Sequence, residues 1–235
     1  MPISAAIREA FALLLAGDGA LWQIVWVTLK TSVLGLALAT PPALLCGYLI
    51  ASHKFLGRRL LIWLLQAALS LPTVLTGLLL YLLLSRQGAL GGWHWLFSQS
   101  GIILGQALIA LPVLAAFTLA AVQAADPRLA ETAITLGAGR WRVMVTVLHE
   151  VRFGVMAALI NGFGRVLSEV GCALMVGGNI AGVTRTITTA IALETSKGEF
   201  AQGIALGVVL IALALLLNAL LMLLQGDTRN AELLR

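Results

Sequence analysis

The chain has 235 residues, of which 60% are hydrophobic and only 11% are charged, and its mean hydropathy is +1.00. So few polar residues cannot cover a water-soluble globule, so the composition predicts an integral membrane protein. The net charge of +5 is not gathered in a basic run interleaved with aromatic residues, which argues against a nucleic-acid-binding face.

The first 17 residues contain no stretch long enough to cross a bilayer. The segment Ile3–Leu15 mixes Arg8 and Glu9 with apolar residues, a pattern typical of a helix that lies in the membrane interface. The same charges argue against a cleavable signal peptide. Residues 1–17 are therefore predicted to form an interfacial segment.

Five longer apolar stretches can each cross the ~30 Å hydrocarbon core as a helix of about 20 residues. They are Leu21–Ala51, Leu60–Leu84, Ile102–Ala125, Phe153–Met175 and Gly203–Leu224. Prolines at 41, 42, 72 and 112 are expected to bend or break three of these helices, either along a transport pathway or as simple packing kinks. The sequence predicts one all-α transmembrane domain over 1–235. Its two cysteines, Cys46 and Cys172, are expected to be buried hydrophobic residues rather than a disulfide.

The basic residues are concentrated in the connections on one side of these spans. That side holds Lys54, Arg58, Arg59, Arg128, Arg140, Arg142, Arg152, Arg229 and Arg235. The other side holds only Arg8, Arg86, Arg185 and Lys197. The positive-inside rule then places the amino terminus outside and the carboxy terminus in the cytoplasm. Lys30 lies about 31 Å from Ala51 along the first helix, so its ammonium is expected at the outer membrane boundary.

A capped helix is predicted in the cytoplasmic segment 126–152, between the third and fourth spans. Asp126 can cap its start, Pro127 suits the first turn, and Gly137 can end it before a second helix opens at Arg140. An ordinary turn between two spans does not need both a cap and a terminator. The segment is therefore interpreted as a short helix that protrudes from the membrane.

Residues of this protruding helix resemble the EAA signature of bacterial ATP-binding-cassette importer permeases. The resemblance is carried by Glu131, Thr132, Ala133 and Gly137. It implies a coupling helix that sits in a groove of a cytoplasmic ATPase. The downstream half of the signature is degenerate, because the chain has Val147–Glu150 where the family has an Ile-x-Leu-Pro pattern.

Arg165 and Glu169 are the deepest charges in the predicted spans. Their i,i+4 spacing predicts that they share one helical face with Gly162 and Cys172. An isolated charge in the bilayer costs at least ~2.5 kcal/mol, so this face must turn toward protein or water. Two interpretations stay open at this point: a structural ion pair that fixes helix packing, or a part of the translocation pathway.

The segment 176–202 is predicted to be an external loop, rich first in glycine and then in hydroxyl groups. Convergent backbone N–H groups, hydroxyls and a guanidinium are all suited to an oxyanion. The candidate residues for an external mouth are Asn179, Thr184, Arg185 and Thr186. The alternative is a gating or docking loop with an exposed Arg185.

Several motifs together resemble the tungstate-type permeases of the molybdate and sulfate permease superfamily. They are Leu71–Val74, Gly77–Leu78, Ser85–Gly88, Ser168–Gly171, Gly177–Ile180, Thr184–Thr186 and Ala190–Gly198. Molybdate and sulfate permeases share the motifs at 178–180 and 184–186 but are less similar over 190–198, so tungstate is the implied cargo and molybdate, sulfate or another small anion is the alternative. The resemblance also implies a bacterial inner-membrane homodimer with two ATPase subunits and an extracytoplasmic substrate-binding protein.

The sequence also argues against two other classes of membrane protein. An intramembrane enzyme is disfavoured because His53, His94 and His149 are scattered among loops and no metal-ligand spacing or cofactor motif occurs. A structural scaffold would need neither the protruding helix nor the charged pair. The chain carries no phosphate-binding Gly-x-x-x-x-Gly-Lys loop, so ATP hydrolysis is expected to come from a partner.

Overall fold

The computed structural model describes residues 8, 12, 15 and 17–232, and all regular secondary structure in this part of the chain is helical. The elements are α2 (Gly19–Ser52), α3 (Arg58–Leu69), α4 (Thr73–Leu84), the 3-10 turn η1 (Gly91–Trp93), α5 (Gln99–Ala124), α6 (Arg128–Thr135), α7 (Arg140–Glu150), α8 (Arg152–Leu167), α9 (Gly171–Gly177), α10 (Ile187–Lys197) and α11 (Phe200–Glu232). The predicted interfacial segment 1–17 lies almost entirely outside the described residues.

Helices α2 and α5 are each long and apolar enough to cross a membrane alone, which confirms the first and third predicted spans. Asp18 caps α2 by accepting a hydrogen bond from the Ala20 amide at 3.1 Å, and Ser98 caps α5 by accepting one from the Gly101 amide at 3.3 Å. Both helices continue through their internal prolines without a break.

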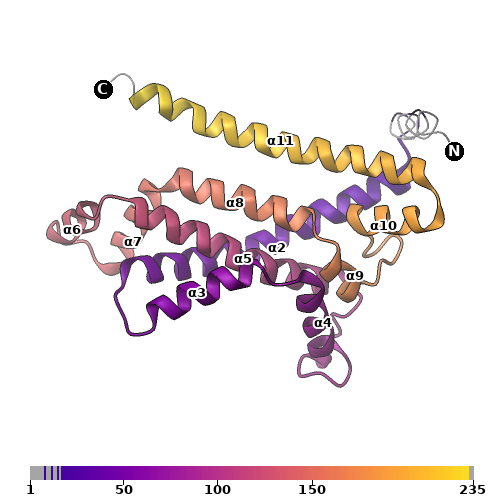
Figure 1. The fold of residues 1–235 in the computed structure, drawn as a ribbon, viewed down its shortest axis with the longest axis horizontal. Helices are drawn as coiled ribbons and strands as arrows, with labels where there is room; N and C mark the ends of the chain where they lie inside the picture. Colours follow the sequence, from indigo (N-terminus) through magenta and orange to yellow (C-terminus); the bar gives the residue numbers. More distant parts are fainter. Residues whose placement is uncertain (1–7, 9–11, 13–14, 16, 233–235) are drawn as a thin grey trace.

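The second predicted span, Leu60–Leu84, is not one helix. It consists of α3 and α4, which meet at an angle of 98°. Pro72 lies at the break, where its ring disfavours helical geometry in Leu71 and its missing N–H cannot continue the ladder of α3. Helix α4 therefore projects sideways from the body (Figure 1).

The fourth predicted span, Phe153–Met175, is also broken. Helix α8 ends at Leu167, and the chain resumes as the short helix α9 only at Gly171. At its other end α8 meets α7 at 74°, around Val151. We call residues 168–170, between α8 and α9, the elbow.

Helix α11 contains the fifth predicted span, Gly203–Leu224, and begins with the apolar stretch Phe200–Leu216. It packs against α10 at its start and against α8 further along. Ala205 and Leu206 of α11 are completely buried in a cluster with Leu21 of α2 and Ile187 of α10. In Figure 1 α11 runs along one side of the molecule for most of its length.

The connections fall at two opposite ends of the molecule. Helices α6 and α7 and the turn between α2 and α3 lie at one end, whereas α9 and α10 lie toward the other (Figure 1). Lys54 in this turn and Arg59 at the start of α3 therefore share an end with Arg128 and Arg140. This is the grouping from which the membrane orientation was predicted.

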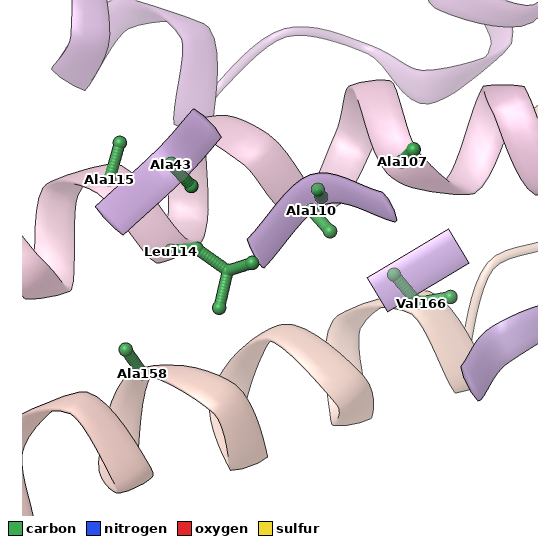
Figure 2. Close-up of a cluster of buried hydrophobic side chains, with 8 residues drawn as sticks. Ala43, Ala107, Ala110, Leu114, Ala115, Ala158 and Val166 are labelled. Atoms are coloured by element: carbon green, nitrogen blue, oxygen red, sulfur yellow. The ribbon is translucent and has the colours of Figure 1, made fainter. Parts of the chain in front are cut away.

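Small residues let the central helices approach closely. Ala43 of α2, Ala110 of α5 and Ala158 of α8 are fully buried around Leu114 (Figure 2). At Gly47 of α2 an added Cβ would lie only 2.7 Å from the Cβ of Thr118 in α5. In a bilayer, where association gains little from the hydrophobic effect, such close backbone contact stabilises helix pairs.

We expect Gly47→Ala to lower the thermal unfolding temperature in detergent, because overpacking costs about 1–3 kcal/mol. The matched control is Gly164→Ala in α8, where an added Cβ meets no atom within 4 Å and alanine favours the helix by up to ~1 kcal/mol. Equal unfolding temperatures for the two variants would contradict the close approach of α2 and α5.

Candidate functional site

The predicted ion pair forms at the elbow. Nη1 of Arg165 lies 3.4 Å from Oε2 of Glu169. The environments of the two side chains differ, because that of Glu169 is 1% exposed and that of Arg165 is 38% exposed. The carboxylate is therefore part of the protein interior, while the guanidinium reaches an open surface.

Glu169 also satisfies backbone groups at the helix break. Its Oε1 accepts a hydrogen bond from the Cys172 amide at 2.9 Å, which caps the start of α9. Its main-chain oxygen accepts a hydrogen bond from the Thr188 hydroxyl at 2.6 Å. Glu169 thus joins three helices, α8, α9 and α10.

The predicted helical face shared by the pair with Gly162 and Cys172 is wrong, because α8 ends before Glu169. Gly162 instead packs against the side chain of Leu114. Cys172 lies on α9, buried against Gly105 of α5. Gly162 and Gly105 thus allow neighbouring helices to pack closely.

An apolar groove of about 700 Å³ lies beside the guanidinium, between α2, α3, α4 and α5. Leu65, Leu79 and Leu108 are among its lining residues, and Arg165 is the only charged residue among them. Cys46 also lines it and is exposed, which corrects the prediction that this cysteine is buried. Both cysteines are free thiols, as predicted.

A polar stripe, which the sequence analysis did not identify, runs along α8 to the first residue of the elbow and includes Arg165. Asn161, Arg165 and Ser168 follow each other at i, i+4 and i+7, and both Asn161 and Ser168 are exposed. The buried residues of the helix, such as Ala158 and Val166, face α2 and α5. Helical spacing counted from Arg165 would have found the stripe.

Two of the predicted mouth residues hold the external loop together. The Thr184 hydroxyl donates to the Gly177 carbonyl at 2.6 Å and accepts from the Ile180 amide at 2.9 Å. Thr186 caps α10 in a reciprocal arrangement with Thr189. Their hydroxyls are therefore engaged within the chain.

The other two predicted mouth residues have unpaired polar atoms. Oδ1 of Asn179 and Nε of Arg185 are buried, and neither has a hydrogen-bond partner among the described residues. Nδ2 of Asn179 donates to the Thr189 carbonyl at 3.4 Å. The structure thus places all four predicted residues in one loop next to α10.

Amide side chains on two long helices anchor this loop, and sequence reasoning missed them. Nε2 of Gln99 donates to the Val183 carbonyl at 2.8 Å, and Nε2 of Gln23 donates to the Gly182 carbonyl at 3.1 Å. Lys30 donates to Oε1 of Gln99 at 3.0 Å, so its ammonium lies at the end of the molecule where it was expected. The only sequence signal was a glutamine near the start of two spans.

The predicted protruding helix is α6. Oδ1 of Asp126 accepts from the Arg128 amide at 2.9 Å, and Gly137 follows the helix with φ +82°, a conformation that favours glycine. On its inner side Ala133 packs against a buried cluster that includes Met144 of α7. Helix α6 is therefore docked firmly onto α7.

The outer side of α6 is exposed and partly apolar. Ile134 is 60% exposed and Leu136 is 83% exposed. Glu131 and Thr132 are also exposed, and the Thr132 hydroxyl donates to the Arg128 carbonyl at 2.8 Å. Exposed large apolar side chains on a docked helix are typical of a protein–protein contact surface.

Two long apolar helices, two bent helix pairs and a protruding helix with an apolar outer side define a polytopic membrane protein of the transporter class. The chain belongs to the family of binding-protein-dependent transport system inner membrane components, whose sequence model matches residues 43–229. It is a transporter subunit, not an enzyme. In the part of the chain that the structure describes, no cluster of His, Cys, Asp and Glu could hold a metal ion.

Named relatives cover most of the chain. A probable anion ABC transporter permease of Haloferax volcanii is 38% identical, over 84% of this chain and 88% of its own. A tungstate uptake system permease of Campylobacter jejuni is 36% identical, over 90% of this chain and 88% of its own. The crystal structure of a bacterial ABC transporter that imports alginate has a TM-score of 0.72 at 19% identity and covers 93% of this chain and 84% of that one, which shows a shared fold.

We expect Arg165 and Glu169 to be energetically coupled. Arg165→Gln strands a buried carboxylate, whereas Glu169→Gln keeps an oxygen for the Cys172 amide and leaves a guanidinium that reaches the groove. The first change should therefore destabilise more, and the double variant should lose less than the sum, with a coupling of about 0.5–3 kcal/mol. Unfolding in detergent of the four proteins measures this, and strict additivity would contradict it.

Proposed function

We propose that the chain is the membrane-spanning subunit of an importer that moves tungstate into the cytoplasm, by alternating access driven by a separate ATPase. The observation that carries the cargo is the similarity to the tungstate uptake permease, which extends over nearly the whole chain. The guanidinium of Arg185 in the external loop adds a donor suited to a tetrahedral dianion. Molybdate or sulfate is the alternative cargo for the same architecture.

The proposed assembly contains two copies of this chain, two cytoplasmic ATP-binding subunits and an extracytoplasmic substrate-binding protein. The chain would lie in a bacterial inner membrane with five membrane-crossing segments, three of them α2, α5 and α11 and two of them broken. The cations of the connections lie together at one end of the molecule. This grouping supports a cytoplasmic position for α6 and the carboxy terminus, and an external position for the amino terminus.

We assign the coupling role to α6, with Glu131, Thr132, Ala133 and Gly137 as the residues of the signature. The inner side of α6 is fixed on α7, while Ile134 and Leu136 remain exposed. A movement of an ATPase bound to this outer side would therefore pass to α7 and, through the bend, to α8. The segment 126–152 acts as the coupling segment in this proposal.

The predicted external loop 176–202 is not all loop, because it contains α10. We assign the external mouth to Asn179, Thr184, Arg185 and Thr186, in the stretch 178–186 between α9 and α10. The engaged hydroxyls of Thr184 and Thr186 shape the loop, and the unpaired Nε–H of Arg185 is left to donate to an anion delivered by the binding protein. The unpaired Oδ1 of Asn179 is an acceptor, so only the second N–H of its amide could contribute. Weak binding suits this position, because transport requires release as well as entry.

Uptake measurements test the cargo. Cells that lack the chain should lose tungstate accumulation, measured by elemental analysis, and regain it with the wild-type chain. Molybdate and sulfate, supplied separately, should enter at lower rates. If molybdate or sulfate uptake depends on the chain and tungstate uptake does not, the cargo assignment is wrong.

We expect Gly137→Leu to uncouple the proposed transporter. A leucine at φ +82° is strained, so the end of α6 and its exposed Leu136 should shift away from the ATPase. Substrate-stimulated ATP hydrolysis should fall several-fold. Gly139→Leu is the control, because Gly139 has φ −68° and open space around its Cβ position. Unchanged assembly and hydrolysis in Gly137→Leu would contradict the assignment.

We expect Arg185→Ala to slow uptake while basal ATP hydrolysis and assembly stay intact, because the change lies at the opposite end of the molecule from α6. Arg86→Ala removes an exposed cation from another loop on the outer side and serves as the control. Normal transport by Arg185→Ala would make the residue a bystander, and loss of assembly would make it a structural anchor.

A further inference from the structure

We propose that Arg165, Asn161 and Ser168 form an oxyanion-transfer site within the membrane, where the cargo replaces Glu169 as the partner of the Arg165 guanidinium. The site would take a tetrahedral dianion and would hold it only through hydrogen bonds and charge. The inference rests on the proposed function for the identity of the cargo.

The first support is the position of the polar stripe in a membrane-spanning helix. Arg165 lies ~20 Å along α8 from Arg152, near the cytoplasmic end, at the usual rise per residue. Polar and charged groups at such depth are costly in lipid and line water-filled cavities or protein contacts. Asn161 and Ser168 are nevertheless exposed, and Arg165 opens onto the groove. An aqueous pathway along this side of α8 would account for all three.

The second support is that Glu169 does not depend on Arg165 to stay in place. Its carboxylate is fixed by the Cys172 amide at 2.9 Å, whereas the contact with Arg165 is 3.4 Å. Charge-assisted N–H···O bonds are commonly about 2.7–2.9 Å, so the pair is loose. In the described part of the chain, Glu169 is the only side chain that accepts a hydrogen bond from the guanidinium, so most of its N–H donors remain available.

The third support is the match between the site and its cargo. A guanidinium can give two parallel hydrogen bonds to two oxygens of an oxyanion. The Asn161 amide can add one more, because only one of its two N–H groups is used, by the Ala157 carbonyl at 2.8 Å. The Ser168 hydroxyl donates to the Arg165 carbonyl at 3.2 Å and would have to exchange that bond for one to the anion. The guanidinium and the dianion also attract each other through their opposite charges. The nearby Glu169 carboxylate weakens this attraction and would recapture Arg165 when the anion leaves, so the site favours passage over storage.

Direct binding to the purified complex of the chain with its ATPase tests the proposal. Sodium tungstate is equilibrated with the complex by dialysis in detergent, and bound tungsten is measured. We expect weak binding to the wild type, a loss of about tenfold or more in Arg165→Gln, and tighter binding in Glu169→Gln, because its guanidinium is no longer partly neutralised. Arg59→Gln makes the same substitution at an exposed cation outside the coupling segment and should bind as the wild type does.

Tungstate affinity should fall in Arg165→Gln and rise in Glu169→Gln, and these opposite changes distinguish a transfer site from a structural ion pair. A purely structural pair would weaken binding in both variants or in neither, and either result overturns the proposal. If Arg165→Gln does not assemble, Arg165→Lys keeps the charge without the fork, and wild-type affinity in that variant also overturns it.

Transport in proteoliposomes, with the binding protein supplied, distinguishes the two levels of inference. If the wild type imports tungstate and Arg165→Gln does so at the same rate, the transfer site is wrong and the proposed function stands. If the assembled wild type imports none of tungstate, molybdate and sulfate, the proposed function is wrong.

Discussion

A helix that stops inside a bilayer leaves backbone N–H and C=O groups that no water can satisfy, so the protein must supply their partners. The elbow between α8 and α9 meets this requirement mainly through Glu169. Its carboxylate takes the Cys172 amide, and its carbonyl takes the Thr188 hydroxyl. The Ser168 amide still bonds to the Gly164 carbonyl. The position of α10, and with it the external loop, follows from this arrangement.

The two broken spans support each other. A Cβ on Gly77 of α4 would lie 2.7 Å from the Cα of Cys172 in α9, and one on Gly171 would lie 2.6 Å from the side chain of Val74. Helices α4 and α9 therefore touch backbone to backbone just beyond their respective breaks. A sideways helix such as α4 keeps its place because a second interrupted span provides a surface that fits it.

The parts predicted correctly from the sequence depend on signals local in the chain. The uninterrupted runs of α2 and α5, the cap and terminator of α6, and the i,i+4 spacing of Arg165 and Glu169 each lie within one segment. Each broken span was predicted as one straight crossing length because apolar composition says whether a segment suits lipid, not in which direction it runs. Pro72 indicated one break, whereas the elbow has no proline and depends on Glu169 meeting Thr188, nineteen positions away.

For the candidate site, the sequence likewise predicted which types of residue are present, but not the hydrogen-bond partners of those residues. The composition of the loop 176–202 indicated anion chemistry, but it could not show that the Thr184 hydroxyl is used by the Gly177 carbonyl. The anchoring of the same loop by Gln23 and Gln99 joins residues 159 and 84 positions apart. Contacts of such range are set by how α2 and α5 pack, and the small residues that allow this packing carry no chemical signature.

The length of α2 has a consequence for the membranes in which the protein can work. Its 34 residues extend ~51 Å, well beyond a hydrocarbon core of ~30 Å, and tilts of up to ~40° do not absorb the difference. Several residues of the helix therefore stand clear of the lipid, and the buried Leu21 shows that its first turn is covered by protein. If the bilayer becomes slightly thinner or thicker, the lipid boundary moves along α2, and α2 is helical on both sides of that boundary. Changes in acyl-chain length should thus disturb α2 less than they would disturb a transmembrane helix whose length only equals the hydrocarbon thickness.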